Sequence, residues 1–267
     1  MGVLDGHRAI VTGGGSGIGA AVCRHLAAAG AAVAVLDRNG ESASGVARES
    51  DGVAIVCDVA NAAAVAAAVD EVVRRIGGVT DLINNAGMGR NKPLHEYSDK
   101  EWDVIVGVNL TGTFNCMRAV IPLMLEAGRG CIVNNASLNA LRPLPGEAPY
   151  SAAKAAVVNL TMTAAVEYAP RIRVNCVSPG LIETPLTEMV TSNAEWRGAA
   201  ERGTPMQRVG TADEVAALVT YLCTDAAAYI TGQNIVIDGG ASLPSLQADS
   251  LLRTIMTNMS RETSKEP

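Results

Sequence analysis

A glycine cluster near the N-terminus separates a short apolar run from an amphipathic stretch. The cluster reads Thr12-Gly13-Gly-Gly-Ser16-Gly17-Ile-Gly19-Ala20. Ala9 to Val11 before it suits a buried parallel strand, and Ile18 to Ala29 has the apolar spacing of a helix. Glycines at such a junction let a pyrophosphate approach the backbone, and the helix N-terminus meets its charge. The order strand, turn, helix therefore predicts a dinucleotide-binding unit. It satisfies both Gly-x-Gly-x-x-Ala and Thr-Gly-x3-Gly-x-Gly.

An acidic residue closes the second predicted strand. This strand, Ala32 to Leu36, is followed by Asp37, which lies 18 residues after Gly19. A carboxylate there accepts hydrogen bonds from the adenosine ribose and repels a 2′-phosphate. Arg38 comes next and either stacks on adenine or offsets part of that repulsion. The pattern favours NAD(H) over NADP(H).

A tyrosine and a lysine stand four residues apart later in the chain. Tyr150 comes thirteen residues after Ser137, and Lys154 follows in the run Tyr150-Ser-Ala-Ala-Lys154. Residues at i and i+4 share one face of a helix. A neighbouring ammonium favours the phenolate, so we expect the pKa of Tyr150 to fall below its reference of about 10. Such a phenol exchanges protons with an alcohol or carbonyl, which is general acid/base catalysis.

Together these residues resemble the short-chain dehydrogenase/reductase family, and the resemblance runs from about His7 to Ser242. Its other matching segments are Asp58-Val59, Asn84-Asn85-Ala86-Gly87, Asn109, Pro179-Gly180 with Thr184, Arg208-Val-Gly, Thr231-Gly232 and Asp238-Gly239-Gly240. Two departures stand out. Ala136 precedes the serine where many relatives carry a second serine, and Ser16 stands in the glycine turn where NADP-preferring members often have a basic residue.

The resemblance implies four catalytic residues. Tyr150 would exchange the proton with the substrate oxygen, and Ser137 would orient that oxygen. Lys154 would bind the nicotinamide ribose and hold the pKa of Tyr150 down. Asn109 would position a water that links Lys154 to solvent. Hydride transfer belongs to the cofactor, so this chemistry requires no metal.

The resemblance also implies a set of cofactor contacts. They are Gly13, Ser16, Gly17, Ile18 and Gly19 at the turn, Asp37 and Arg38 after the second strand, Asp58 and Val59 at the adenine, Asn85, Ala86 and Gly87 along the central strands, Tyr150 and Lys154 at the ribose, and Pro179, Gly180, Ile182 and Thr184 at the carboxamide. Asn85 to Gly87 would also brace the central strands.

Strand and helix patterns alternate along the chain without a linker. We expect strands at His7–Thr12, Ala32–Asp37, Ala54–Cys57, Leu82–Asn84, Gly130–Asn135, Arg173–Ser178 and Asn234–Ile237. The longest predicted helices lie near Trp102–Ala127 and Tyr150–Ala169. Such alternation predicts a single-domain α/β fold, a doubly wound, Rossmann-like parallel sheet with helices on both faces and its ligand crevice at the carboxyl strand ends.

We expect one domain over residues 1–242 and an extension over residues 243–267. By resemblance, residues 183–210 form a substrate lid, the alternative being a surface helix pair. Its predicted wall residues are Leu186, Met189, Val190 and Trp196. Together with these lid residues, we expect the substrate to be faced by Leu138, Asn139, Leu141, Pro143 and Glu147. This mixture fits a mid-sized, partly apolar alcohol or ketone and leaves sugars, steroids, acyl groups and xenobiotics open.

The composition of the chain argues against several classes of binding partner. The 267 residues carry a net charge of −6 with no basic run, which argues against nucleic acid. Six cysteines lie far apart in apolar settings, which favours reduced thiols, and the three histidines lack metal-ligand spacing. The N-terminal stretch has no apolar segment of signal-peptide length. We expect a cytoplasmic protein with no membrane partner and no bound metal.

The function predicted from these residues is hydride transfer between NAD(H) and a secondary alcohol or ketone. Two alternatives stay open, an NADPH-dependent 3-oxoacyl reductase and a non-catalytic dinucleotide-binding sensor on the same fold. A sensor usually lacks the tyrosine or the lysine, and both are present here.

The resemblance further implies a homotetramer or homodimer. We expect the interface on the two long helices, where Val157, Val158, Thr161 and Ala165 are small and apolar, with burial inside one chain as the alternative. The terminal strand Asn234–Asp238 is a second candidate. In the extension, apolar residues recur at helical spacing from Leu251 to Met259. We expect this stripe to dock on a neighbouring subunit or over the lid, or else to form a disordered tail.

Overall fold

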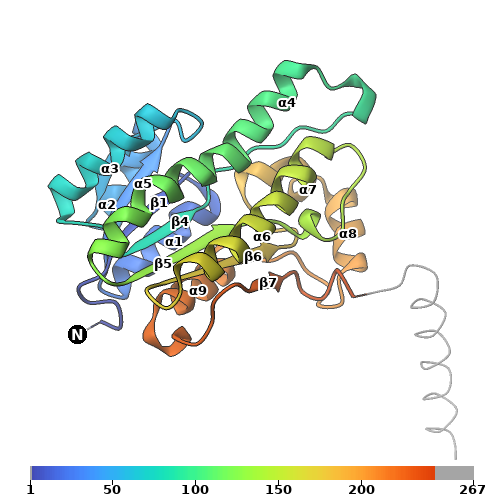
Figure 1. The fold of residues 1–267 in the computed structure, drawn as a ribbon. Helices are drawn as coiled ribbons and strands as arrows, with labels where there is room; N and C mark the ends of the chain where they lie inside the picture. Colours follow the sequence, from blue (N-terminus) through green and yellow to red (C-terminus); the bar gives the residue numbers. More distant parts are fainter. Residues whose placement is uncertain (1, 244–267) are drawn as a thin grey trace, which may run out of the picture.

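The computed structural model describes residues 2–243 and contains one parallel sheet of seven strands (Figure 1). The strand order is β3-β2-β1-β4-β5-β6-β7. The order reverses beside β1, which is the switch point where α/β sheets bind ligands. The strands are β1 (Arg8–Thr12), β2 (Ala32–Asp37), β3 (Val53–Val56), β4 (Asp81–Asn84), β5 (Gly130–Asn135), β6 (Ile172–Pro179) and β7 (Asn234–Ile237).

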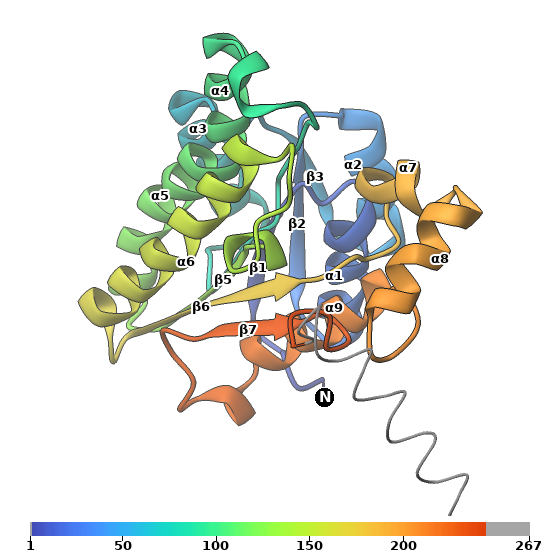
Figure 2. The ribbon, with the colours of Figure 1, turned by 90° about the vertical axis from the view of Figure 1, so that its right-hand side faces the viewer.

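Helices cover both faces of this sheet, as Figure 2 shows. One face carries α1 (Gly17–Ala28), α2 (Gly40–Glu49) and α9 (Ala212–Cys223). The other carries α3 (Ala62–Ile76), α5 (Gly112–Glu126) and α6 (Ala148–Tyr168). Strand side chains alternate between the two cores: in β1, Ile10 packs on one side while Ala9 and Val11 pack on the other.

The remaining helices lie at the edge that carries the site. Helix α4 (Asp99–Val106) begins at a capping box formed by Ser98 and Glu101 and leads through a π-helical turn (Gly107–Thr111) into α5. Two short helices, α7 (Glu188–Thr191) and α8 (Ala194–Gly203), follow β6. The continuous helical stretch from Asp99 to Glu126 is long and apolar enough to cross a membrane. Half of its most apolar window is buried in the fold, and α5 packs against α3, as in the core of a globular protein.

The predicted doubly wound α/β fold is confirmed. Three strands have the predicted bounds, and the others differ by one residue at one or both ends. The predicted long helix over Trp102–Ala127 is confirmed as the continuous stretch Asp99–Glu126, in which a π-helical turn separates α4 from α5. The predicted helical stripe from Leu251 to Met259 lies outside the described residues.

The face of α6 that we expected at a subunit interface is buried within the chain. Of its four residues, Val157, Thr161 and Ala165 are at most 3% exposed because they face β5 and β6, and Val158 is partly buried. The exposed apolar residues of α6 are instead Met162 and Val166, with exposed fractions of 43% and 84%. The expectation was wrong because α6 is apolar nearly all round, so periodicity did not distinguish its two faces.

Candidate active site

Three residues from two elements meet at the carboxyl end of β5. Ser137 lies just past that strand, and its hydroxyl accepts a hydrogen bond from the backbone N–H of Asn139 at 3.1 Å, which caps a short 3₁₀ turn. Tyr150 and Lys154 lie on α6, whose first turn contains Pro149. The Lys154 Nζ atom is 5.6 Å from the centre of the Tyr150 ring. The structure thus brings together the predicted serine, tyrosine and lysine.

The electrostatics of this group differ from the sequence expectation. Burial raises the pKa of Tyr150 above its usual value, and a hydrogen bond with Ser137 works in the opposite direction. Burial also lowers the pKa of Lys154 to about 8. The expectation that Lys154 holds the pKa of Tyr150 down is therefore wrong for the chain alone. Desolvation of the phenolate outweighs an ammonium that is directed elsewhere.

The Lys154 ammonium donates to the backbone carbonyl oxygen of Asn135 at 2.6 Å. Asn109 approaches from the π-helical turn, where its Nδ2 donates to the carbonyl oxygens of Met88 at 2.7 Å and Ile105 at 2.8 Å. A Cβ atom on Gly87 would lie 3.0 Å from Asn109 Oδ1 and 3.6 Å from Lys154 Nζ. The two side chains therefore converge on one small residue. Asn109 is anchored to backbone carbonyl oxygens beside the lysine, and its predicted role in positioning a water stays a prediction.

The glycine turn leaves the start of α1 open to an anion. The Ser16 side chain makes no capping hydrogen bond, and the first turn of α1 contains no acidic residue. Its N–H groups are therefore free to bind a phosphate. Gly13 has a φ of +60°, and a Cβ on it would lie 2.8 Å from the Cα of Ala86. A Cβ on Gly19 would lie 2.1 Å from the Gly13 carbonyl oxygen. Both positions therefore require glycine, which lets the turn pack tightly on itself and on Ala86 beside the open N-terminus of α1.

Asp37 lies directly beside that turn. Its Oδ2 accepts from the Gly15 backbone N–H at 3.0 Å, and its Oδ1 accepts from the Asn39 N–H at 2.9 Å. The carboxylate is thereby fixed at the carboxyl end of β2, where an adenosine ribose would lie. Arg38 next to it is exposed.

The adenine-side residues come from the end of β3. Asp58 is exposed, and its Oδ1 accepts from the Ala60 N–H at 3.0 Å. Val59 is buried, and its carbonyl oxygen accepts from Asn115 of α5 at 3.0 Å. Asp58 and Val59 therefore lie on a loop anchored to the helix layer, on the same sheet edge as Asp37.

A polar network joins the three central strands beneath the turn. The Asn85 Nδ2 donates to the carbonyl oxygens of Thr12 and Gly13, each at 3.1 Å, and its Oδ1 accepts from Asn135 at 2.9 Å. The Thr12 hydroxyl accepts from the N–H groups of Asn85 at 3.0 Å and Ala86 at 3.1 Å. These hydrogen bonds confirm that Asn85 braces the central strands. We did not predict from the sequence that Thr12 also bridges them, although its position directly before Gly13 could have indicated this.

The segment after β6 returns to the glycine turn. A Cβ on Gly17 would lie 3.3 Å from the Cβ of Thr184, so the predicted carboxamide-binding residue lies against the turn that starts α1. Pro179 ends β6, and a Cβ on Gly180 would lie 2.8 Å from the Cβ of Asp238, which leaves room for glycine only. Ile182 is buried and pairs with Gly210.

Beyond Thr184, the predicted lid forms α7 and α8. Arg197 holds the segment together through ion pairs with Glu183 and Glu201, both at 3.0 Å. Leu186 and Met189 are 59% and 60% exposed, so their apolar surfaces are accessible to a ligand. On the opposite side, Asn139 donates to the half-buried Glu147, whose pKa is raised by burial.

The chain matches the family model described as Enoyl-(Acyl carrier protein) reductase over residues 13–242. It also matches relatives along almost their whole length. It is 41% identical over 250 residues to the D-threitol dehydrogenase of Mycolicibacterium smegmatis, covering 90% of this chain and 94% of that protein. The chain belongs to the short-chain dehydrogenase/reductase family.

Two solved structures of this family are similar in shape. One is a 3-ketoacyl-(acyl-carrier-protein) reductase from Brucella melitensis complexed with NADH, with a TM-score of 0.84 and 36% identity, covering 90% of this chain and 100% of that chain. The other is a gluconate 5-dehydrogenase from Burkholderia cenocepacia in complex with NADP and tartrate, with a TM-score of 0.87 and 37% identity, covering 91% and 97%. The family and the geometry identify this short-chain dehydrogenase/reductase as an NAD(P)-dependent oxidoreductase of alcohol or ketone groups.

Proposed function

We propose that this short-chain dehydrogenase/reductase prefers NAD(H) and interconverts a secondary alcohol and a ketone. The observation that carries the cofactor preference is the position of Asp37, whose carboxylate is fixed by Gly15 and Asn39 beside the glycine turn. A 2′-phosphate there would meet a fixed negative charge. The turn itself offers Ser16 and no basic side chain.

The bound nicotinamide supplies or accepts the hydride, and the chain supplies the proton and the orientation. In ketone reduction, the Tyr150 hydroxyl gives its proton to the substrate oxygen, while the Ser137 hydroxyl holds that oxygen in place. In alcohol oxidation, the Tyr150 phenolate takes the proton. Lys154 stabilises the phenolate when its ammonium turns from the Asn135 carbonyl, and Asn109 positions water for proton exchange with solvent.

We propose that the substrate lies between α7 and the turn after Ser137. The apolar side comes from Leu186 and Met189, and the polar side comes from Glu147 with Asn139. A carboxylate at that wall accepts a hydrogen bond from a substrate hydroxyl, which favours small polyols and hydroxy ketones over purely apolar ketones. The D-threitol dehydrogenase among the relatives is consistent with this preference.

One experiment tests the reaction and the cofactor together. Initial rates of a panel of secondary alcohols, polyols and a 3-oxoacyl thioester would be measured with NAD(H) and NADP(H), for wild type and Tyr150→Phe. We expect turnover with NAD(H), and a loss of about 10²–10⁴-fold in Tyr150→Phe with retained NADH binding. Stronger activity with NADPH and the thioester would favour the 3-oxoacyl reductase instead. Dinucleotide binding without turnover on any substrate would favour a sensor.

We further propose a cytoplasmic homotetramer or homodimer. Supporting this assembly are exposed apolar side chains that one chain leaves uncovered: Phe114 on α5 is 44% exposed, and Met162 and Val166 lie on the neighbouring α6. Val236 on the edge strand β7 is 37% exposed, which offers a second contact. Light scattering of the full chain tests this, since a monomer at assay concentration would contradict it.

A further inference from the structure

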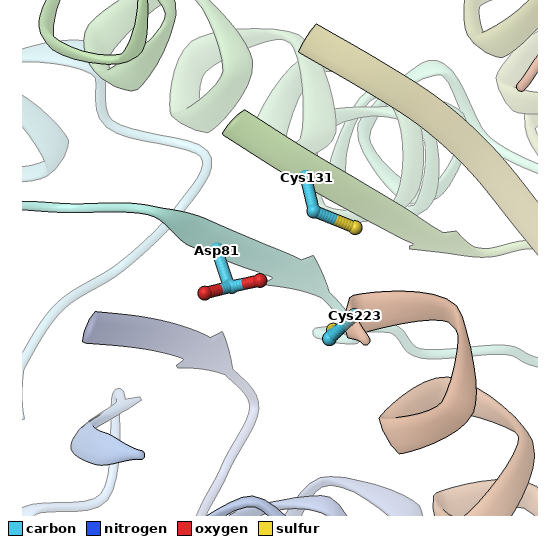
Figure 3. Close-up of side chains that lie close together, drawn as sticks. All are labelled: Asp81, Cys131 and Cys223. Atoms are coloured by element: carbon cyan, nitrogen blue, oxygen red, sulfur yellow. The ribbon is translucent and has the colours of Figure 1, made fainter. Parts of the chain in front are cut away.

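A buried group of two thiols and a carboxylate lies at the opposite end of the sheet from the active site. Asp81 begins β4, Cys131 is its direct neighbour on β5, and Cys223 ends α9. A carboxylate oxygen of Asp81 and the two sulfur atoms all lie within 4.8 Å of one another. Figure 3 shows the three side chains pointing toward a common space. All three residues are at most 4% exposed.

One oxygen atom in this group lacks a partner. The Asp81 Oδ2 accepts from His7 Nδ1 at 2.8 Å and from the Thr80 hydroxyl at 2.6 Å. The Asp81 Oδ1 is buried and has no hydrogen-bond partner among the described residues. A buried carboxylate oxygen without a partner is unfavourable by a few kcal/mol in general. Its position beside two thiols therefore points to a ligand that binds all three atoms.

We propose that Asp81, Cys131 and Cys223 form a structural site for one zinc ion. Two thiolates and a carboxylate are ligand types that Zn²⁺ takes in proteins, and a separation below 4.8 Å between ligand atoms suits a tetrahedral ion. The Leu222 carbonyl oxygen lies next to the group, 3.4 Å from the Cys131 sulfur. His7 orients the carboxylate from outside, as a supporting residue does at a metal ligand.

Zn²⁺ bound by two thiolates and one carboxylate would carry a summed charge of −1, which a nearby positive side chain partly balances. The Arg173 guanidinium donates to the Leu222 carbonyl oxygen at 2.7 Å and lies at the edge of the group. On binding, each thiol releases one proton to solvent and its sulfur binds the ion.

Such a site would fasten the end of α9 to two central strands. The ligands come from three elements, which is why sequence spacing gave no sign of a metal. The site lies outside the proposed catalytic group, so its presence is separable from the cofactor and substrate chemistry.

The test uses the full chain and measures metal directly. After incubation with Zn²⁺ and exhaustive dialysis, elemental analysis should give one equivalent per chain. Co²⁺ in its place should give a thiolate charge-transfer absorption in the near ultraviolet. Cys131→Ser and Cys223→Ser should each abolish both signals. Cys116→Ala is the matched control, because Cys116 is equally buried and neighbours another thiol, Cys57, but belongs to no three-ligand group among the described residues.

Three results would overturn the proposal. One is a wild-type chain that retains no zinc and shows no cobalt absorption, a measurement that needs no variant to fold. Another is zinc retained equally in Cys131→Ser and Cys223→Ser. The third is a mass two hydrogens lower than the reduced chain with Cys131 joined to Cys223, which would show a disulfide in place of the ion.

Discussion

The Lys154 ammonium donates to the backbone carbonyl oxygen of Asn135 at 2.6 Å. This hydrogen bond holds a 3% exposed charge at the carboxyl end of β5 and leaves the ammonium 5.6 Å from the Tyr150 ring centre. Burial lowers the pKa of Lys154 to about 8 from 10.5, so the charged form is disfavoured in the fold. Lys154 is therefore a residue that the proposed reaction needs but whose charged form lowers the stability of the fold.

Lys154→Met should lower turnover and raise stability at neutral pH. A pKa of about 8 against 10.5 corresponds to a stability loss on the order of 3 kcal/mol below pH 8. The unfolded chain binds this proton more tightly, so the wild type gains stability as pH rises from about 8 to 10.5. Denaturant unfolding at pH 7 and pH 10 measures this, with activity expected to fall at least about 10²-fold.

Lys100→Met on α4 serves as the control, because Lys100 is exposed. It should change neither stability nor activity measurably. A Lys154→Met protein less stable than wild type at pH 7 would show that the Asn135 hydrogen bond outweighs the cost of burying the ammonium.

Local sequence patterns were sufficient to predict much of the fold and of the candidate site. The turn around Gly13 and Gly17 is encoded in consecutive residues, and the spacing of Tyr150 and Lys154 fixes them on one helix face wherever that helix packs. The strand Gly130–Asn135 contains an apolar run from Cys131 to Val133, and such runs predict strands because the strands of a covered parallel sheet are buried on both faces.

Other features depend on packing between distant segments. The direction of the Lys154 ammonium follows from where β5 ends, which is why the shift expected for the pKa of Tyr150 from the Tyr-x3-Lys spacing had the wrong sign. Asp81 and Cys131 are neighbours because of the register between β4 and β5, and no local sequence pattern predicts that register. The prediction of which face of α6 lies at a subunit interface was wrong for the same reason. The sequence of a helix that is apolar nearly all round does not indicate which side packs on the sheet.

The alcohol-oxidation rate should rise with pH across the alkaline range. Oxidation needs the Tyr150 phenolate, and burial raises the pKa of that phenol. The Ser137 hydrogen bond lowers this pKa, so Ser137→Ala should move the rising limb of the kcat/KM profile to higher pH as well as lower the rate. Ketone reduction uses the neutral phenol and should stay level at neutral pH. A Ser137→Ala profile with an unchanged midpoint would contradict this coupling.

Asp37→Ser should relax the preference for NAD(H). The change removes the fixed charge beside the glycine turn and the acceptor for the ribose hydroxyls, so kcat/KM with NADH should fall and that with NADPH should rise. Asp37→Asn is the matched variant, since its amide oxygen still accepts from the Gly15 N–H while the charge is gone. If repulsion dominates, both variants gain with NADPH about equally. Unchanged ratios in both would place the selectivity at another residue, with Arg38 the first to examine.

Two glycines should respond in opposite directions to alanine. Gly13 has a φ of +60°, and a Cβ there would lie 2.8 Å from the Ala86 backbone, so Gly13→Ala should destabilise the fold by about 2–4 kcal/mol and weaken NADH binding. Gly45 lies inside α2 with open space around the position of a Cβ, so Gly45→Ala should stabilise by about 0.5–1 kcal/mol and leave NADH binding unchanged. Thermal unfolding and NADH fluorescence titration of both variants measure these effects. A Gly13→Ala chain as stable as wild type would show that the turn can move away from Ala86. The requirement for glycine at this position of the turn would then be wrong.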